Sequence, residues 1–76
     1  MDEKTICQNI QKLRQRQGLT LARLAQLSGL TKGYLSRVER SVKAPPYATL
    51  NKIARALGVE VTTLLEVRLD PPADVE

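Results

Sequence analysis

The chain has 76 residues, enough for one small domain, and its 42% hydrophobic and 26% charged residues are typical of a globular protein. It contains no His and one cysteine, Cys7, which excludes a disulfide framework, a thiolate metal cluster and every His-dependent catalytic triad. The net charge is +4, but residues 4–59 hold eleven Lys or Arg and a single acid, Glu39, which gives that block a net charge of +10.

Apolar residues recur at helical spacing in five segments, and no strand pattern is present, so we predict an all-α, compact five-helix fold. Thr and Gly at the segment ends supply N-caps and C-caps, and two prolines exclude a helix through the loop SVKAPPY. The expected helices run from about Ile6 to Gly18, from the N-cap Thr20 to Gly29, from the N-cap Thr31 through Val38, over Leu50–Leu57, and around Val61–Leu65.

The second and third expected helices are joined by very few residues around Gly29. Such a short connection forces a steep crossing, which is the geometry of a helix-turn-helix. Ala25 is small enough for the helices to touch, and Gly29 tolerates the positive φ that the turn needs. With Leu35 and Val38 as the inner positions of the next helix, the sequence predicts a helix-turn-helix motif over about residues 21–40.

The segment LARLAQLSGLTKGYLSRVER, the proline-containing loop and ATLNKIARALGV together resemble the Cro/cI-type (XRE) helix-turn-helix family of bacterial and phage regulators. The resemblance covers about Ile10 to Leu65 and implies a lambda-repressor-like DNA-binding domain. It is strongest to members that carry a C-terminal ligand-sensing cupin domain, so an effector is expected only through a domain not present here. We divide the chain into a DNA-binding domain, residues 1–67, and a proline-containing acidic tail or truncated linker, residues 68–76.

The resemblance implies a transcription regulator, a repressor or autoregulator, that binds double-stranded DNA sequence-specifically through the major groove. The third helix reads base edges in this motif, and the family's base-contacting positions correspond to Lys32, Gly33 and Arg37, with Ser36 adjacent. Arg37 can bind guanine through two hydrogen bonds. Gly33 costs about 1 kcal/mol inside a helix relative to Ala, which we attribute to close approach to the groove floor or to room for neighbouring side chains.

Phosphate contacts are expected where backbone N–H groups or cations flank that helix. Many family members carry Gln at the positions of Leu21 and Gly33, so this chain departs from the usual contact set and its operator sequence stays open. Tyr34 is assigned either to a phosphate through its hydroxyl or to packing through its ring. The candidate phosphate contacts are Thr20, Tyr34, Arg40, Lys43 and Tyr47.

Glu39 corresponds to a family acid that pairs with an Arg of the first helix, here Arg14, and a buried structural ion pair would explain one carboxylate in a cationic block. A single recognition helix contacts few bases, so we expect a homodimer on a pseudo-palindromic operator. The predicted dimer surface lies at the C-terminal end and consists of Leu64, Leu65, Val67 and Leu69.

Charge alone does not separate a DNA-binding surface from a solvated basic face. Some relatives act as antitoxins or bind partner proteins. The missing Gln side chains and the acidic tail leave room for that alternative function, a protein-interaction or antitoxin-type module with weak DNA binding. A hydrolase is excluded because the central block has no His and only one carboxylate, and we expect no enzyme activity, cofactor or metal. The sequence shows no membrane span and no signal peptide, which favours a cytoplasmic protein that joins the bacterial nucleoid when bound to DNA.

Overall fold

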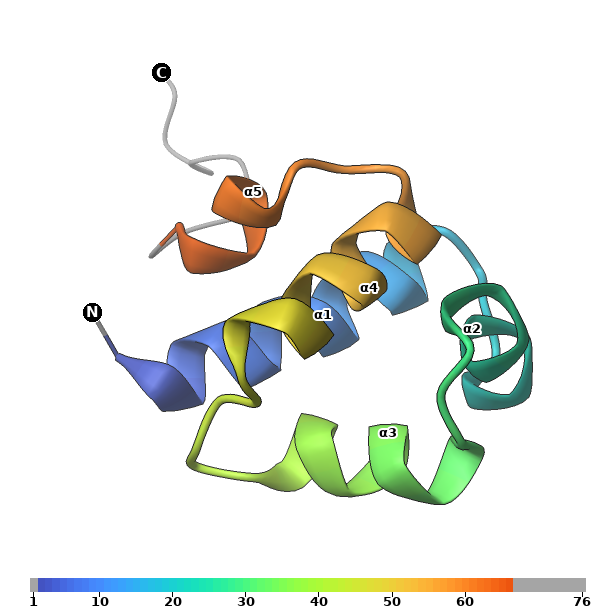
Figure 1. The fold of residues 1–76 in the computed structure, drawn as a ribbon, viewed down its shortest axis with the longest axis horizontal. Coiled ribbons are helices and arrows are strands. Elements are labelled where there is room, and N and C mark those ends of the chain that lie inside the picture. The colour runs from blue at the N-terminus through green and yellow to red at the C-terminus, as the bar shows by residue number, and fades with distance from the viewer. Residues whose placement is uncertain (1, 67–76) are drawn as a thin grey trace.

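The computed structural model describes residues 2–66, which form five helices and, within that range, no strand. These are α1 (Glu3–Arg16), α2 (Leu21–Ser28), α3 (Lys32–Arg40), α4 (Tyr47–Leu57) and α5 (Val61–Leu65). In Figure 1, α1 and α4 run together through the middle of the molecule, α2 and α3 lie on the side and below, and α5 closes the upper end. The all-α prediction is confirmed, and no helix among residues 2–66 is long and apolar enough to cross a membrane.

The helix boundaries follow from local capping chemistry. Thr20 and Thr31 each accept a hydrogen bond at Oγ1 from a backbone N–H three residues later, at 3.0 Å, and so begin α2 and α3. Gly29 ends α2 with φ of 76°, a left-handed conformation that glycine adopts without a Cβ clash. The N–H of Gly29 donates to the carbonyl of Ala25 at 2.9 Å, which completes the tight turn between α2 and α3.

The core receives one large, fully buried aliphatic side chain from each helix. Each such side chain contributes about 1.5–3 kcal/mol of hydrophobic stabilisation. Because α5 has only five residues, its position depends on this packing rather than on helix propensity. The five buried aliphatic residues, one from each helix, are Ile10, Leu24, Leu35, Ile53 and Leu64, all with 0% exposure.

Leu64 corrects the predicted dimer surface. It was expected to lie on the surface, but it points into the core of its own chain and is completely covered there. The number of apolar residues in so short a helix does not determine which of their side chains face the interior. Leu65 is half-buried, whereas Val67 and Leu69 lie outside the described residues.

Asn9 on α1 and Gln17, the residue that caps its C-terminus, attach α1 to the C-terminal ends of two other helices. The buried amide of Asn9 donates to the carbonyl of Leu64 at 3.0 Å and also to that of Glu66. The amide of Gln17 donates to the carbonyl of Leu57 at 2.7 Å. These three bonds satisfy carbonyls at helix ends that have no partner within their own helix. These hydrogen bonds therefore fix α4 and α5 against α1.

Candidate nucleic-acid interface

An ion pair lies behind α3 and joins it to α1. Nε of Arg14 donates to Oε2 of Glu39 at 2.6 Å and Nη2 donates to Oε1 at 3.0 Å, while Nη1 donates to the carbonyl of Leu19 at 2.7 Å. The two side chains are only 12% and 4% exposed. The hydrogen bonds to Glu39 raise the pKa of Arg14 above its ordinary value, against the opposing effect of burial. The pair expected from the resemblance is thus present and fixes the inner face of α3.

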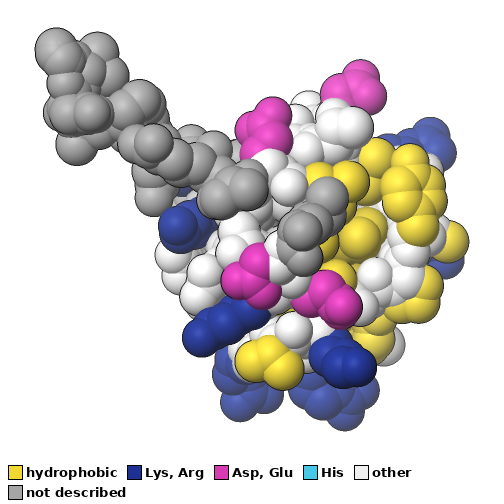
Figure 2. Space-filling view, turned by 90° about the vertical axis from the view of Figure 1, so that its left-hand side faces the viewer, with side chains coloured by type: hydrophobic (Ala, Val, Ile, Leu, Met, Phe, Trp, Pro, Cys, Tyr) yellow, Lys and Arg dark blue, Asp and Glu magenta, His cyan; other side chains and the backbone are white. Residues whose placement is uncertain are grey.

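The outward face of α3 carries exposed cations. Lys32, Gly33 and Arg37 are exposed and Ser36 is half-buried. No carboxylate among residues 2–66 forms an ion pair with Lys32 or Arg37. Figure 2 shows Lys and Arg side chains along the lower edge of the molecule, at the height of α3 in Figure 1, with the acidic side chains mostly above them. The outer face of α3 can therefore contact an anionic partner without first breaking an ion pair.

Gly33 lies in the first turn of this exposed face. A Cβ built on Gly33 would meet no atom within 4 Å. The structure therefore contradicts the idea that glycine is needed to make room for neighbouring side chains of the same chain. Of the two reasons given for Gly33, only the approach of an external partner to the helix backbone is left.

The candidate phosphate contacts lie at the start of α2, on α3, in the loop that follows it and at the start of α4. Thr20 is exposed at the start of α2, where its hydroxyl already accepts the capping N–H of Arg23. Nε of Arg40 donates to the carbonyl of Ser36 at 3.2 Å, so that side chain lies along α3. Tyr47 is 64% exposed at the first residue of α4. These groups lie at or beside three helices, where the phosphate backbone of a nucleic acid is a suitable partner.

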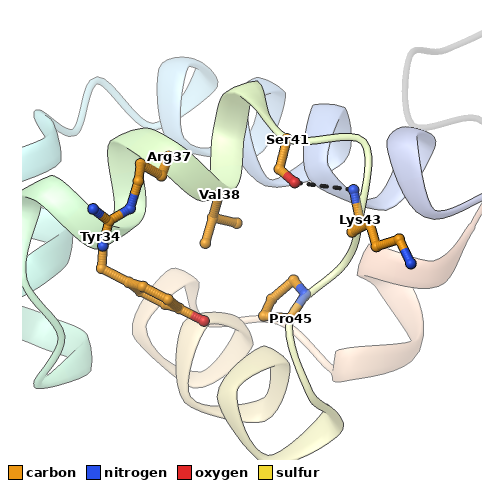
Figure 3. A pocket seen from close by; sticks show the side chains of 6 residues that line it. All are labelled: Tyr34, Arg37, Val38, Ser41, Lys43 and Pro45. Atoms are coloured by element: carbon orange, nitrogen blue, oxygen red, sulfur yellow. Dashed lines mark hydrogen bonds between the residues drawn. The ribbon is translucent and has the colours of Figure 1, made fainter.

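A hollow of about 180 Å³ lies between α3 and the loop that leads to α4. Figure 3 shows the ring of Tyr34 and the ring of Pro45 on opposite sides of it, with Arg37 at the α3 side and Lys43 on the loop. Tyr34 is half-buried and its ring packs against the core, so packing is one of its roles. Its hydroxyl points into the hollow (Figure 3), which leaves a phosphate contact open to it.

A second, larger hollow lies around the start of α2 and the turn before α3. Arg23 lines it, and its Nη1 donates to Oε1 of Gln26 at 2.9 Å. Arg23 is not among the predicted contacts, although a cation three residues after the N-cap Thr20 is a sequence signal for one. The lining residues are Thr20, Ala22, Arg23, Ala25, Gln26 and Leu30.

Comparison with known proteins identifies similar chains. The HTH_3 family model, described as helix-turn-helix, matches residues 10–64. The HTH-type transcriptional regulator SutR of Escherichia coli (strain K12) is 41% identical over 56 residues, which is 74% of this chain and 32% of SutR. The immunity repressor protein of Bacillus phage phi105 is 34% identical over 61 residues, 80% of this chain and 42% of that protein. The chain thus spans less than half the length of these two relatives.

A solved structure is similar over nearly all of its own length. The crystal structure of SinR, the master regulator for biofilm formation, in complex with DNA has 39% sequence identity to this chain and a TM-score of 0.73. The match covers 80% of this chain and 98% of that one. At this identity the likeness extends to sequence as well as to fold.

Proposed function

This chain belongs to the HTH_3 helix-turn-helix family of Cro/cI type, and we propose that it is a transcription regulator that binds double-stranded DNA with α3 in the major groove. The observation that carries the proposal is the outward face of α3, where exposed cations have no carboxylate partner among residues 2–66. The similarity to SinR, solved in complex with DNA, supports the same conclusion.

Within this proposal, the residues of α3 divide into base and backbone contacts. Arg37 lies at the centre of the outward face and reads guanine, since its guanidinium can donate to both O6 and N7. Lys32 reaches base acceptors from the N-terminal end of α3, and Gly33 and Ser36 allow the helix to approach the bases closely. The backbone contacts fix register without reading sequence, and they are Thr20, Tyr34, Arg40, Lys43 and Tyr47.

We propose further that the protein acts as a homodimer on a pseudo-palindromic operator. Two copies related by a two-fold axis place their α3 helices about 34–36 Å apart, which is one turn of B-DNA. The pairing surface lies beside α5 and includes Leu65, while Val67 and Leu69 belong to the same proposed surface outside the described residues. Leu64 supports that surface from the core instead of contacting the partner.

The regulatory role is that of a repressor or autoregulator in the bacterial cytoplasm, with no catalysis and no cofactor of its own. The similarity to a phage immunity repressor supports repression. We also propose that the chain is related to cupin-linked members of the family, in which case an effector would act through that further domain. We propose that residues 1–67 are the domain that binds DNA and that residues 68–76 are an acidic tail or linker.

Selection of bound sequences from a random duplex pool tests the function directly. We expect an enriched site with two inverted halves, and an affinity that falls steeply with salt because Lys and Arg displace counterions. Sedimentation of the protein on the selected site should show two chains per duplex. A pool without enrichment and with weak binding would instead support the alternative, a protein-interaction or antitoxin-type module.

A further inference from the structure

Two side chains of α1 hold one peptide group in the loop between α3 and α4. The thiol of Cys7 donates to the carbonyl oxygen of Lys43, with an S···O distance of 3.4 Å. The backbone N–H of Ala44 donates to Oε1 of Glu3 at 2.8 Å. The carbonyl of Lys43 and the N–H of Ala44 belong to the same planar peptide group. This group is therefore bonded on both of its polar edges.

The arrangement follows from helix geometry. Glu3 and Cys7 are four residues apart on α1, so they lie on the same face, one turn above the other. One supplies a hydrogen-bond acceptor and the other a donor, which matches the two edges of a peptide group. Burial and the nearby carboxylate of Glu3 raise the pKa of the Cys7 thiol, which keeps it protonated and able to donate at neutral pH.

The remaining backbone polar group of Lys43 is bonded as well. Its N–H donates to Oγ of Ser41 at 3.0 Å, the bond drawn in Figure 3. The backbone of Lys43 is thus bonded at both its N–H and its carbonyl, although the residue lies in a loop and its side chain is exposed. A fixed backbone restricts the directions in which the lysine side chain can leave the loop.

We propose that Glu3 and Cys7 are positioning residues for DNA binding, which fix the Lys43–Ala44 peptide group so that the ammonium of Lys43 is directed at a DNA phosphate before the DNA arrives. This inference rests on the proposed function and on Lys43 as a phosphate contact. Ordering a flexible lysine during binding costs affinity, and a loop ordered in advance lowers that cost.

Electrostatics alone predicts the opposite role for Glu3. A carboxylate beside a phosphate-binding loop repels DNA, so removing its charge should strengthen binding. The two effects can be separated because Glu3→Gln removes the charge and keeps an oxygen acceptor for the N–H of Ala44, whereas Glu3→Ala removes both. The two variants have the same net charge, and each is the control for the other.

The experiment measures the affinity of both variants for the selected duplex at one salt concentration. We expect Glu3→Ala to bind about two- to ten-fold more weakly than Glu3→Gln, the range expected for ordering one long side chain. In a Lys43→Ala background the difference between the two variants should disappear, because the group being positioned is gone. Hydrogen exchange of the Ala44 amide should be faster in Glu3→Ala than in Glu3→Gln.

Equal affinities of Glu3→Ala and Glu3→Gln would overturn the positioning role, and so would a difference that persists without the Lys43 side chain. Melting temperatures of all variants show whether a loss of affinity follows from loss of fold. Failure of the proposed function is distinguishable, since the random duplex pool would then yield no enriched site for the unaltered protein.

Discussion

The ion pair between Arg14 and Glu39 allows the most quantitative prediction. Glu39 accepts two hydrogen bonds from the guanidinium and is 4% exposed, and Arg14 is 12% exposed, so little water can replace either partner. Glu39→Ala leaves the Arg14 cation with its hydrogen bond to the carbonyl of Leu19 but without its carboxylate partner. Removing one member of such a pair costs about 3–5 kcal/mol, because the other charge stays buried without compensation.

That cost is large for so small a chain. At roughly 0.05–0.15 kcal/mol per residue, a chain of this length has a total stability of about 4–11 kcal/mol. Glu39→Ala or Arg14→Ala should therefore remove a large part of the stability, measured as the free energy of unfolding from urea titrations followed by circular dichroism. The double variant should cost less than the sum of the single ones.

The pH at which the single and double variants are compared follows from the direction of the Arg14 pKa shift. Pairing with Glu39 raises the pKa of Arg14 in the folded state above its unfolded value. A raised pKa of a cation contributes stability that is complete below the unfolded pKa and is lost only as pH rises through the folded one. The Arg14 contribution is thus fully present at neutral pH. Small, additive effects of the two substitutions there would refute the reasoning.

Three further predictions concern single residues. Gly33→Ala should stabilise the fold by about 0.5–1 kcal/mol, since its Cβ meets no atom within 4 Å, and should weaken DNA binding; a lower melting temperature would contradict this. Lys43→Ala should weaken binding to all duplexes alike and lower the magnitude of the salt slope by about 1, and a loss confined to one sequence would make Lys43 a base contact. Cys7 should react with a thiol reagent only when the chain unfolds, because it is buried and its raised pKa disfavours the thiolate; rapid labelling of the native protein would contradict this. The raised pKa of Cys7 also contributes stability to the folded state below the ordinary value of 9.0, and this contribution is lost as pH rises further.

The fold was predictable because its signals are local. Thr20 and Thr31 are caps whose hydrogen bonds reach only three residues along the chain, and the apolar period needs no knowledge of distant partners. Leu64 shows the limit of such reasoning, because the same apolar residue can face its own core or a second chain. Only the three-dimensional packing of α5 on α1 decides between these positions.

The site was predictable only in part. The outward face of α3 follows from the helical period, but the pair of Arg14 with Glu39 came from the family resemblance and not from spacing. The two hydrogen bonds that hold the Lys43–Ala44 peptide group were not predicted from the sequence. Its two bonds join residues 36 and 41 positions apart, and an acid in the first turn of a helix, such as Glu3, is already explained by the helix dipole.

The central claim is that α3 reads bases through Arg37, and the most direct test measures binding of the unaltered protein and Arg37→Ala to every single-base variant of the selected operator. The account predicts that Arg37→Ala loses about 1–3 kcal/mol on the selected site and becomes indifferent to the base at one position in each half-site. An equal loss on every variant, with base preference unchanged, would contradict it and make Arg37 a phosphate contact.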